Sequence, residues 1–260
     1  MTEIQRPGAL YQQVAAALRE AILSGEYEHG APLPSEAQLI KRYSVSRPTV
    51  RNAVAALRAE GLIEVIHGKG SFVRLSPAPV LTIERRITRS GAGRYTTHTG
   101  TSWEQSEEPG VYRTRTTAET GQALHLGEEE ALFGCDRLLL DPASGTRALH
   151  RTLIPFAVAE EVPELGQHPD SEPARIYELL AKAGHALWWS ETVQARMPLP
   201  DERTALQTPD ATPVLHLSRT THGADDRPLL LEEMRLGADR AQAAYRITAD
   251  KAPAARRSRA

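Results

Sequence analysis

The 260-residue sequence lacks several features that define whole classes of protein. Its single cysteine, Cys135, cannot form an internal disulfide or hold a metal ion alone, so we expect it in the core. No run of about 18 apolar residues occurs, and residues 1–8 lack the apolar segment of a signal peptide. These absences predict an intracellular, cytoplasmic protein with no membrane partner.

Common catalytic motifs are absent as well. The sequence contains no G-x-S-x-G, H-E-x-x-H or G-x-G-x-x-G, and no cluster of His, Cys and carboxylates at metal-ligand spacing. Gly68–Ser71 resembles part of a phosphate-binding loop but lacks its upstream glycine and its following helix. We therefore expect neither an enzyme nor a bound cofactor or metal.

The net charge of −2 is unevenly distributed. Residues 1–75 hold 9 Lys and Arg against 7 Asp and Glu, residues 76–250 hold 18 against 26, and residues 251–260 add 4 basic residues. The N-terminal part is only weakly basic, so any attraction to phosphate must come from a few placed residues. The acidic remainder suits a different role.

Two helices are predicted near the N-terminus. Apolar residues recur every four positions at Val14, Leu18 and Ile22. This spacing predicts an amphipathic helix over 10–24. Ser35, with Gln38 three residues later, forms a capping-box pattern that predicts a short helix over 36–43.

A third helix and a hairpin follow. Ser46 is a good N-cap, Pro48 is tolerated in a first turn, and Gly61 supplies the end of the helix. Residues 62–66 and 71–73 have strand character and flank a turn with two glycines. Two short helices on a tight link, with a supporting helix and a hairpin, predict a winged helix-turn-helix.

The start of the third helix carries the residues that indicate function. Arg47 and Arg51 are four apart and share one face, while Val50 points toward the core. Arginine reads guanine through two parallel hydrogen bonds, and an exposed helix N-terminus fits the major groove. The pattern predicts binding to double-stranded DNA; the alternative is a solvated face of two arginines.

This segment resembles the winged helix-turn-helix of the GntR family of bacterial repressors. The matching residues include Tyr11–Ala15, Leu33–Glu36, Val45–Arg47, Thr49–Arg51, Glu60–Ile63 and Gly68–Val73. The resemblance implies a homodimer that contacts its DNA operator through Ser35, Glu36, Ser46, Arg47, Pro48, Thr49, Arg51, His67, Gly68 and Lys69. Pro48 and Ala37 depart from residues common in relatives, which changes the expected operator preference.

The remainder of the chain is predicted to be an α+β domain with a mostly antiparallel sheet. Strands are expected at 111–117, 132–140, 149–154, 191–197, 214–221 and 229–235, and helices at 175–183 and 201–206. The segment 91–110 has few apolar residues and is expected to be a loop.

Within the GntR family, this pattern is similar to the UTRA ligand-binding domain of the HutC branch. The supporting residues are Cys135–Leu138, Leu153–Pro155, Ile176–Leu180, Pro213–Leu215, Arg227–Pro228 and Glu232–Glu233. The strands conflict with the branch whose domain is all-helical, and the length is too short for the branch with an aminotransferase. The resemblance implies a chorismate-lyase-like fold that binds a small-molecule effector without catalysis.

The effector-binding residues expected from this resemblance are Arg137, His150, Arg175, Tyr177 and Glu233. Relatives that bind sugar phosphates have a second arginine where this chain has Leu139, so a sugar phosphate is not favoured. Arg137 and Arg175 are suited to an anion, with solvated or ion-paired arginines as the alternative.

The predicted organisation is a DNA-binding domain at 8–75, a linker at 76–80, an effector-binding and dimerisation domain at 81–248, and a basic disordered tail at 249–260. The predicted function is an effector-responsive repressor that binds a palindromic operator. The alternative is a DNA-binding protein whose C-terminal domain only dimerises.

Overall fold

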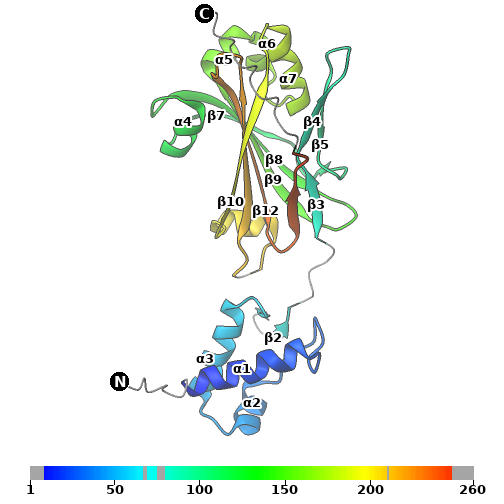
Figure 1. The fold of residues 1–260 in the computed structure, drawn as a ribbon. Coiled ribbons are helices and arrows are strands. Elements are labelled where there is room, and N and C mark those ends of the chain that lie inside the picture. Colours follow the sequence, from blue (N-terminus) through cyan, green and yellow to red (C-terminus); the bar gives the residue numbers. More distant parts are fainter. Residues whose placement is uncertain (1–8, 67–68, 75–79, 210, 248–260) are drawn as a thin grey trace, which may run out of the picture.

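The computed structural model describes residues 9–66, 69–74, 80–209 and 211–247. A small helical part, here called the head, lies at one end of the molecule, and a larger domain built on a β-sheet lies at the other (Figure 1). The predicted wing-tip residues His67 and Gly68, positions 76–79 of the predicted linker and the predicted tail lie outside the described residues.

The head has the predicted order of elements. These are α1 (Leu10–Leu23), α2 (Glu36–Tyr43), α3 (Arg47–Ala59), β1 (Ile63–Ile66) and β2 (Gly70–Val73). The side-chain oxygens of Ser35 and Ser46 accept hydrogen bonds from the backbone amides of Gln38 and Thr49, at 3.3 and 3.4 Å. Local capping therefore fixes where α2 and α3 begin, and the predicted winged helix-turn-helix is confirmed.

One apolar core holds the head together. Its fully buried members are Leu18, Leu39, Val50, Ala53 and Leu57, each no more than 1% exposed. Gly61 ends α3 with a positive φ of 73°, and a Cβ there would lie 3.1 Å from Nη1 of Arg74. This glycine therefore both stops the helix and leaves space for the Arg74 side chain.

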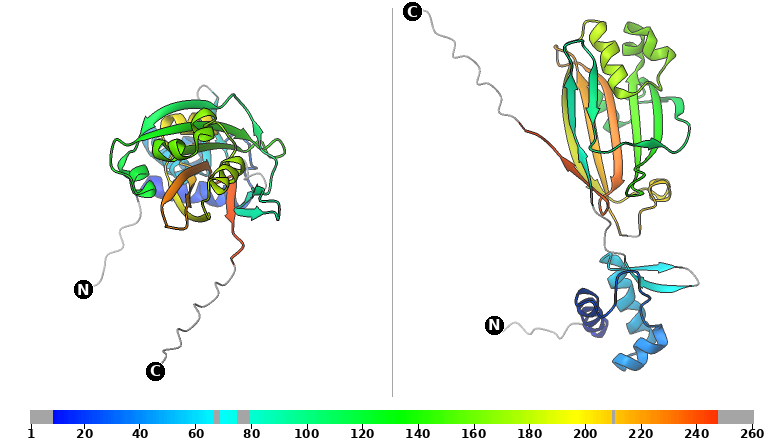
Figure 2. Two further views of the ribbon diagram at one scale, coloured as in Figure 1. Left: turned by 90° about the horizontal axis from the view of Figure 1, so that it is seen from above. Right: turned by 90° about the vertical axis from the view of Figure 1, so that its right-hand side faces the viewer.

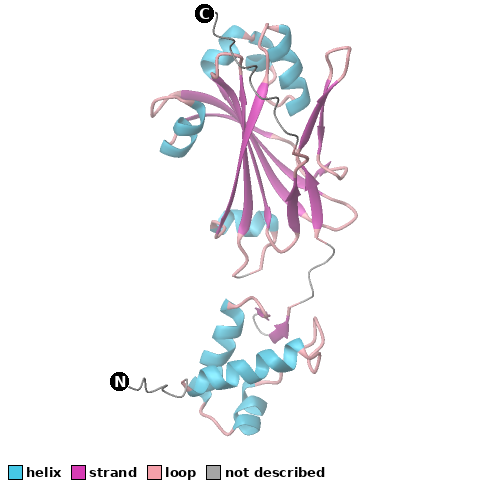
Figure 3. Cartoon of the chain, viewed as in Figure 1, coloured by secondary structure: helices cyan, strands magenta, loops and turns pink. Residues whose placement is uncertain are grey.

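The larger domain contains the remaining elements (Figure 3). Its strands are β3 (Leu81–Glu84), β4 (Arg86–Arg89), β5 (Tyr95–His98), β6 (Glu104–Gln105), β7 (Gly110–Arg115), β8 (Ala131–Leu140), β9 (Arg147–Pro155), β10 (Trp188–Arg196), β11 (Val214–His222), β12 (Pro228–Gly237) and β13 (Ala241–Ala244). Its helices are α4 (Ala118–Leu124), α5 (Phe156–Glu161), α6 (Pro163–Gln167), α7 (Pro173–Lys182) and α8 (Pro200–Leu206).

A seven-stranded antiparallel sheet organises this domain. Its order is β10-β11-β12-β9-β8-β6, and β7 also pairs with β8. On one face, α7 contributes Ile176, Tyr177 and Leu180 to a buried cluster with the sheet. On the opposite face, α4 packs Leu124 against Leu231 of β12. The α+β prediction is confirmed, and Figure 2 shows the helices gathered at the ends and faces of the sheet.

The prediction of a continuous loop over 91–110 is wrong. β5 pairs with β4, and the two residues of β6 pair with β8. Each strand is short, and few of its residues are apolar, so alternation gave no signal. Tyr95 is the exception, because it is 7% exposed and packs edge-on against the ring of Tyr177. Cys135 is buried in the sheet domain, as expected.

Candidate nucleic-acid interface and buried cavity

The first two turns of α3 present two arginines to solvent. The side chains of Arg47 and Arg51 are 63% and 62% exposed. Both approach Glu36 at the start of α2: Nε of Arg51 donates to Oε1 at 2.9 Å, and Nε of Arg47 lies 3.8 Å from Oε2. Glu36 thus aligns two cationic side chains that α3 places on one face.

The other predicted residues on this surface have mainly structural contacts. The hydroxyls of Ser46 and Thr49 lie 2.8 Å apart at the start of α3, and Ser35 occupies the equivalent position in α2. Pro48 is exposed in the first turn. These caps use the backbone amides of Gln38 and Thr49, and Pro48 has no N–H, so few amides of the first turn of α3 remain free.

The wing extends from the far end of α3. Lys69 is exposed, and its backbone amide donates to the carbonyl of Ile66 at 3.0 Å. The base of the hairpin is fixed by burial of Ile63 and Val73 in the head core. α3 and the described part of the hairpin therefore share one core, with cations at the start of α3 and at Lys69.

The larger domain contains a separate cavity of about 270 Å³. Its floor is the face of the sheet that α7 covers, and residues from 97 to 105 form its rim. The lining residues are Arg85, Thr97, His98, Thr99, Thr101, Trp103, Gln105, Arg137, Leu139, His150, Glu172, Pro173, Arg219, Glu232 and Met234. The lining therefore combines charged groups with a few apolar side chains, as ligand pockets do.

Arg137 is the most informative residue of the cavity. It is 2% exposed, and its Nη2 donates to the carbonyls of Asp170 and Ser171 at 2.6 and 3.0 Å. Its Nε and Nη1 atoms are buried without a hydrogen-bond partner. The nearest carboxylate belongs to Glu172, 3.7 Å from Nε, with a side chain that is 71% exposed. A buried guanidinium with unused donors favours an anionic ligand.

The other charges of the cavity are compensated by neighbours. Arg85 and Arg219 share the carboxylate of Glu191, at 2.6 and 2.7 Å. Glu232 accepts a hydrogen bond from the hydroxyl of Tyr177, and its Oε1 lies 3.8 Å from Nε2 of His150. This wall can position a ligand, and its two arginines are already paired with a carboxylate.

Burial and charge act in opposite directions on Glu232. Burial alone would raise the pKa of its carboxyl, but the contacts with His150 and Arg219 outweigh that effect and lower the pKa. Burial of the Tyr177 hydroxyl, together with the charge of Glu232, raises the pKa of Tyr177 well above its ordinary value. The pair therefore stays as a carboxylate and a neutral phenol near neutral pH.

The structure brings only part of the predicted effector set together. Arg137 and His150 line the cavity, and Tyr177 supports it from behind through Glu232. Arg175 does not reach it, because its guanidinium is bound by Glu164 at 2.6 Å and Glu178 at 3.2 Å on the outer surface of α7.

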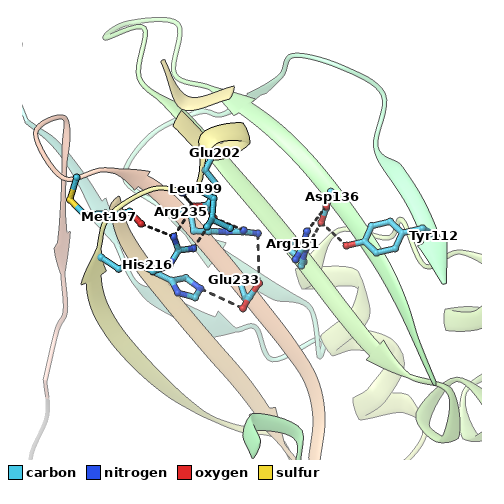
Figure 4. Close-up of polar contacts among 10 residues, drawn as sticks. Tyr112, Asp136, Arg151, Met197, Leu199, Glu202, His216, Glu233 and Arg235 are labelled. Carbon is cyan, nitrogen blue, oxygen red and sulfur yellow. Dashed lines mark hydrogen bonds and ion pairs between the residues drawn. The ribbon is translucent and has the colours of Figure 1, made fainter. Parts of the chain in front are cut away.

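Glu233 also lies away from the cavity. It points to the opposite face of the sheet, where His216 and Arg235 are its neighbours at 3.5 and 3.7 Å (Figure 4). The neighbouring residue Glu232 lines the cavity instead, because successive residues of a strand face opposite sides of the sheet. Sequence reasoning missed Glu232 and Arg219, which pair in register on adjacent strands.

Among the described residues, no helix is both long and apolar enough to cross a bilayer. Within the same residues, no group of three or more His, Cys, Asp or Glu is placed to hold a metal ion. The two features of this part of the chain that we consider further are the exposed arginine surface of the head and the cavity.

Comparison with known proteins identifies both parts of the chain. Residues 10–73 match the family described as bacterial regulatory proteins, gntR family, and residues 110–242, just over half of the chain, match the UTRA domain. The chain therefore combines a head that matches the gntR family with a larger domain that matches the UTRA domain. Because the UTRA match covers more than half of the chain, the chain belongs to the UTRA domain family.

Individual relatives agree with this assignment. An uncharacterised HTH-type transcriptional regulator of Streptomyces coelicolor is 28% identical over 238 residues, which cover 83% of this chain and 84% of that protein. The repressor NagR of Bacillus subtilis is 39% identical over 69 residues, 26% of this chain and 28% of NagR. A regulator of Rhizobium meliloti is 36% identical over 102 residues, 39% of this chain and 42% of that protein. The match thus spans less than half of that relative's length.

A solved structure shows the same overall fold. The crystal structure of a protein described as a GntR-family transcriptional regulator has a TM-score of 0.66 to this chain and is 23% identical. The alignment covers 94% of this chain and 99% of that one.

Proposed function

We propose that this chain is an effector-responsive repressor of the HutC branch, acting in the bacterial cytoplasm on a palindromic operator as a homodimer. The head reads DNA through Arg47 and Arg51, with Lys69 on the wing holding the backbone. Reading by one head covers only a few base pairs, so two heads related by a two-fold axis are needed for a selective site. NagR and the mannosyl-D-glycerate system regulator MngR, which resemble the head, are both described as repressors.

The observation that carries the effector part is the buried guanidinium of Arg137 in the cavity, whose Nε and Nη1 make no hydrogen bond. A buried cation with unused donors destabilises the empty protein, and a small anion supplies the missing acceptors. We assign the anion-binding role to Arg137, and supporting roles to His150, Glu232 and Tyr177. This observation favours an effector-binding domain over one that only dimerises.

The test is a thermal-shift screen of small carboxylates and phosphorylated metabolites. A compound that binds should raise the melting temperature of the wild type, by an amount that grows with its concentration. The shift should be lost in Arg137→Met, which removes the charge but keeps most of the side-chain volume. It should persist in Arg175→Ala, which removes an arginine outside the cavity.

Each stabilising compound is then added to the protein–operator complex. The proposal predicts that it weakens operator binding, because it favours a state in which the heads are wrongly spaced. If no compound gives a shift that depends on Arg137, or if binding leaves operator affinity unchanged, the effector part of the proposal is incorrect.

A further inference from the structure

A second cavity lies where the head meets the sheet domain. Its volume is about 330 Å³, and it is here called the junction cavity. The end of α1 and the base of the wing line it from the head, and Pro209, Asp239 and Arg240 line it from the sheet domain. A cavity of this size lies within the range of small-molecule sites. Because its walls belong to two parts of the chain, the cavity is complete only while the head is docked on the sheet domain.

The head side of the junction cavity is largely apolar. Ile22, Leu62 and Val73 line it, and Leu23 at the end of α1 is 73% exposed. An aliphatic side chain with that much exposure gains stability when an apolar group covers it. This wall therefore fits the apolar part of a ligand.

Charged side chains also line the junction cavity, and two of them have no partner. Arg74 and Asp239 form an ion pair at 2.8 Å, so their charges compensate each other. Glu64 of β1 and Arg240, which follows β12, are both partly buried. Among the described residues, neither side chain forms a hydrogen bond or an ion pair. The cavity thus offers one free carboxylate from the head and one free guanidinium from the sheet domain.

We infer that the junction cavity binds a free α-amino acid with an apolar side chain. The ammonium group of the ligand donates to the carboxylate of Glu64, and its carboxylate accepts from the guanidinium of Arg240. Its side chain packs on Leu23 and the apolar residues beside it. A ligand with only a negative charge would be repelled by Glu64, and one with only a positive charge by Arg240. A ligand that carries both charges is therefore favoured over either.

Such a ligand provides a second regulatory input. It contacts Glu64 of the head and Arg240 of the sheet domain at the same time, so it binds only the docked arrangement and must favour that arrangement over others. Among the described residues, the junction cavity shares no lining residue with the cavity around Arg137, here called the effector cavity. The inference therefore goes beyond the proposed function and does not depend on the identity of the effector.

Isothermal titration calorimetry of the full chain with L-leucine and L-phenylalanine tests the inference. At least one of the two should bind, and loss of either charge of the ligand should abolish binding. For leucine, isocaproate lacks the amine and isoamylamine lacks the carboxylate, so neither should bind. Glycine keeps both charges without the apolar part and should also fail to bind.

Substitutions in the protein test the same contacts. Glu64→Gln and Arg240→Gln should each weaken binding by about 10- to 100-fold, because each removes a hydrogen bond between charged groups. Neither side chain has a partner in the protein, so both variants should melt at the wild-type temperature. Glu20→Gln and Arg86→Gln are the controls, since each removes an exposed charge outside the junction cavity. Both should bind the amino acid as wild type does.

Distances between a spin label on the head and one on the sheet domain give a second measurement. The bound amino acid should narrow their distribution in wild type but not in Glu64→Gln. Absence of binding by both amino acids, or binding that survives Glu64→Gln and Arg240→Gln, would overturn the inference. Loss of binding in Arg137→Met alone would place the amino acid in the effector cavity, which overturns the junction site and leaves the proposed function standing.

Discussion

Nη2 of Arg74 donates a 2.8 Å hydrogen bond to Oδ2 of Asp239 and so joins the head to the sheet domain. The same atom donates to the hydroxyl of Thr212, and Nη1 donates to the carbonyl of Gly61 at the end of α3. Asp239 follows β12 by two residues, and β12 contributes Glu232 and Met234 to the cavity. One strand therefore connects the cavity to the contact that holds the recognition helix.

Removal of this contact should loosen the head. Arg74→Ala eliminates a partly buried ion pair and its hydrogen bonds, at a cost on the order of 1–2 kcal/mol to the docked arrangement. The distribution of distances between a spin label on the head and one on the sheet domain should broaden. The exposed Arg86 provides the control, and Arg86→Ala should leave the distribution unchanged. An unchanged distribution in Arg74→Ala would show that the contact does not position the head.

A second prediction concerns Glu36, which neutralises part of the charge of Arg47 and Arg51. Glu36→Gln should strengthen binding to any duplex and steepen its salt dependence, because the arginines become free to neutralise phosphates. It should also reduce the preference for operator over random DNA, because Glu36 no longer holds the two arginine side chains in position. Titrations with operator and random DNA at several salt concentrations measure both effects.

Glu60→Gln is the matched control for that experiment. Glu60 also binds an arginine of the head, Arg19, at 2.5 Å, but it lies at the other end of α3. Equal salt slopes for wild type and Glu36→Gln would contradict the assignment of this surface.

Stability at acid pH should depend on Glu202, which is 2% exposed. Burial alone would raise the pKa of its carboxyl, but hydrogen bonds from Arg196, the Leu199 amide and Arg235 outweigh burial and lower the pKa from 4.5 to about 2. Because the folded state holds this pKa below its unfolded value, the stabilisation is complete above about pH 4.5. It is lost as the pH falls toward 2 and amounts to on the order of 3 kcal/mol.

Urea unfolding between pH 6 and pH 2.5 measures this contribution. Glu202→Gln should be less stable than wild type at pH 6 and should lose less stability on acidification. The exposed Glu108 is the control, and Glu108→Gln should follow the wild-type curve. Parallel curves for Glu202→Gln and wild type would show that other carboxyls cause the acid sensitivity.

Sequence alone placed the elements of the head closely because their signals are local. Ser35, Ser46 and Gly61 mark helix ends through contacts within a few residues. The cavity depends on distant segments. β13 pairs with β3 although Ala241 and Leu81 are far apart in the chain, and the choice between Glu232 and Glu233 depends on how β12 pairs with β11 and β9. No periodicity within one segment determines such contacts.

The central claim is that the chain reads a specific DNA sequence through Arg47, and operator affinity tests it most directly. The wild type first selects its preferred sites from random DNA. The affinity for these sites is then measured for wild type, for Arg47→Ala and for the control Arg94→Ala, which removes an exposed arginine of the other domain. Arg47→Ala should lose about 1–3 kcal/mol of binding per head and accept substitutions at the base it reads, while Arg94→Ala binds as wild type. Wild-type affinity and selectivity in Arg47→Ala would contradict the account.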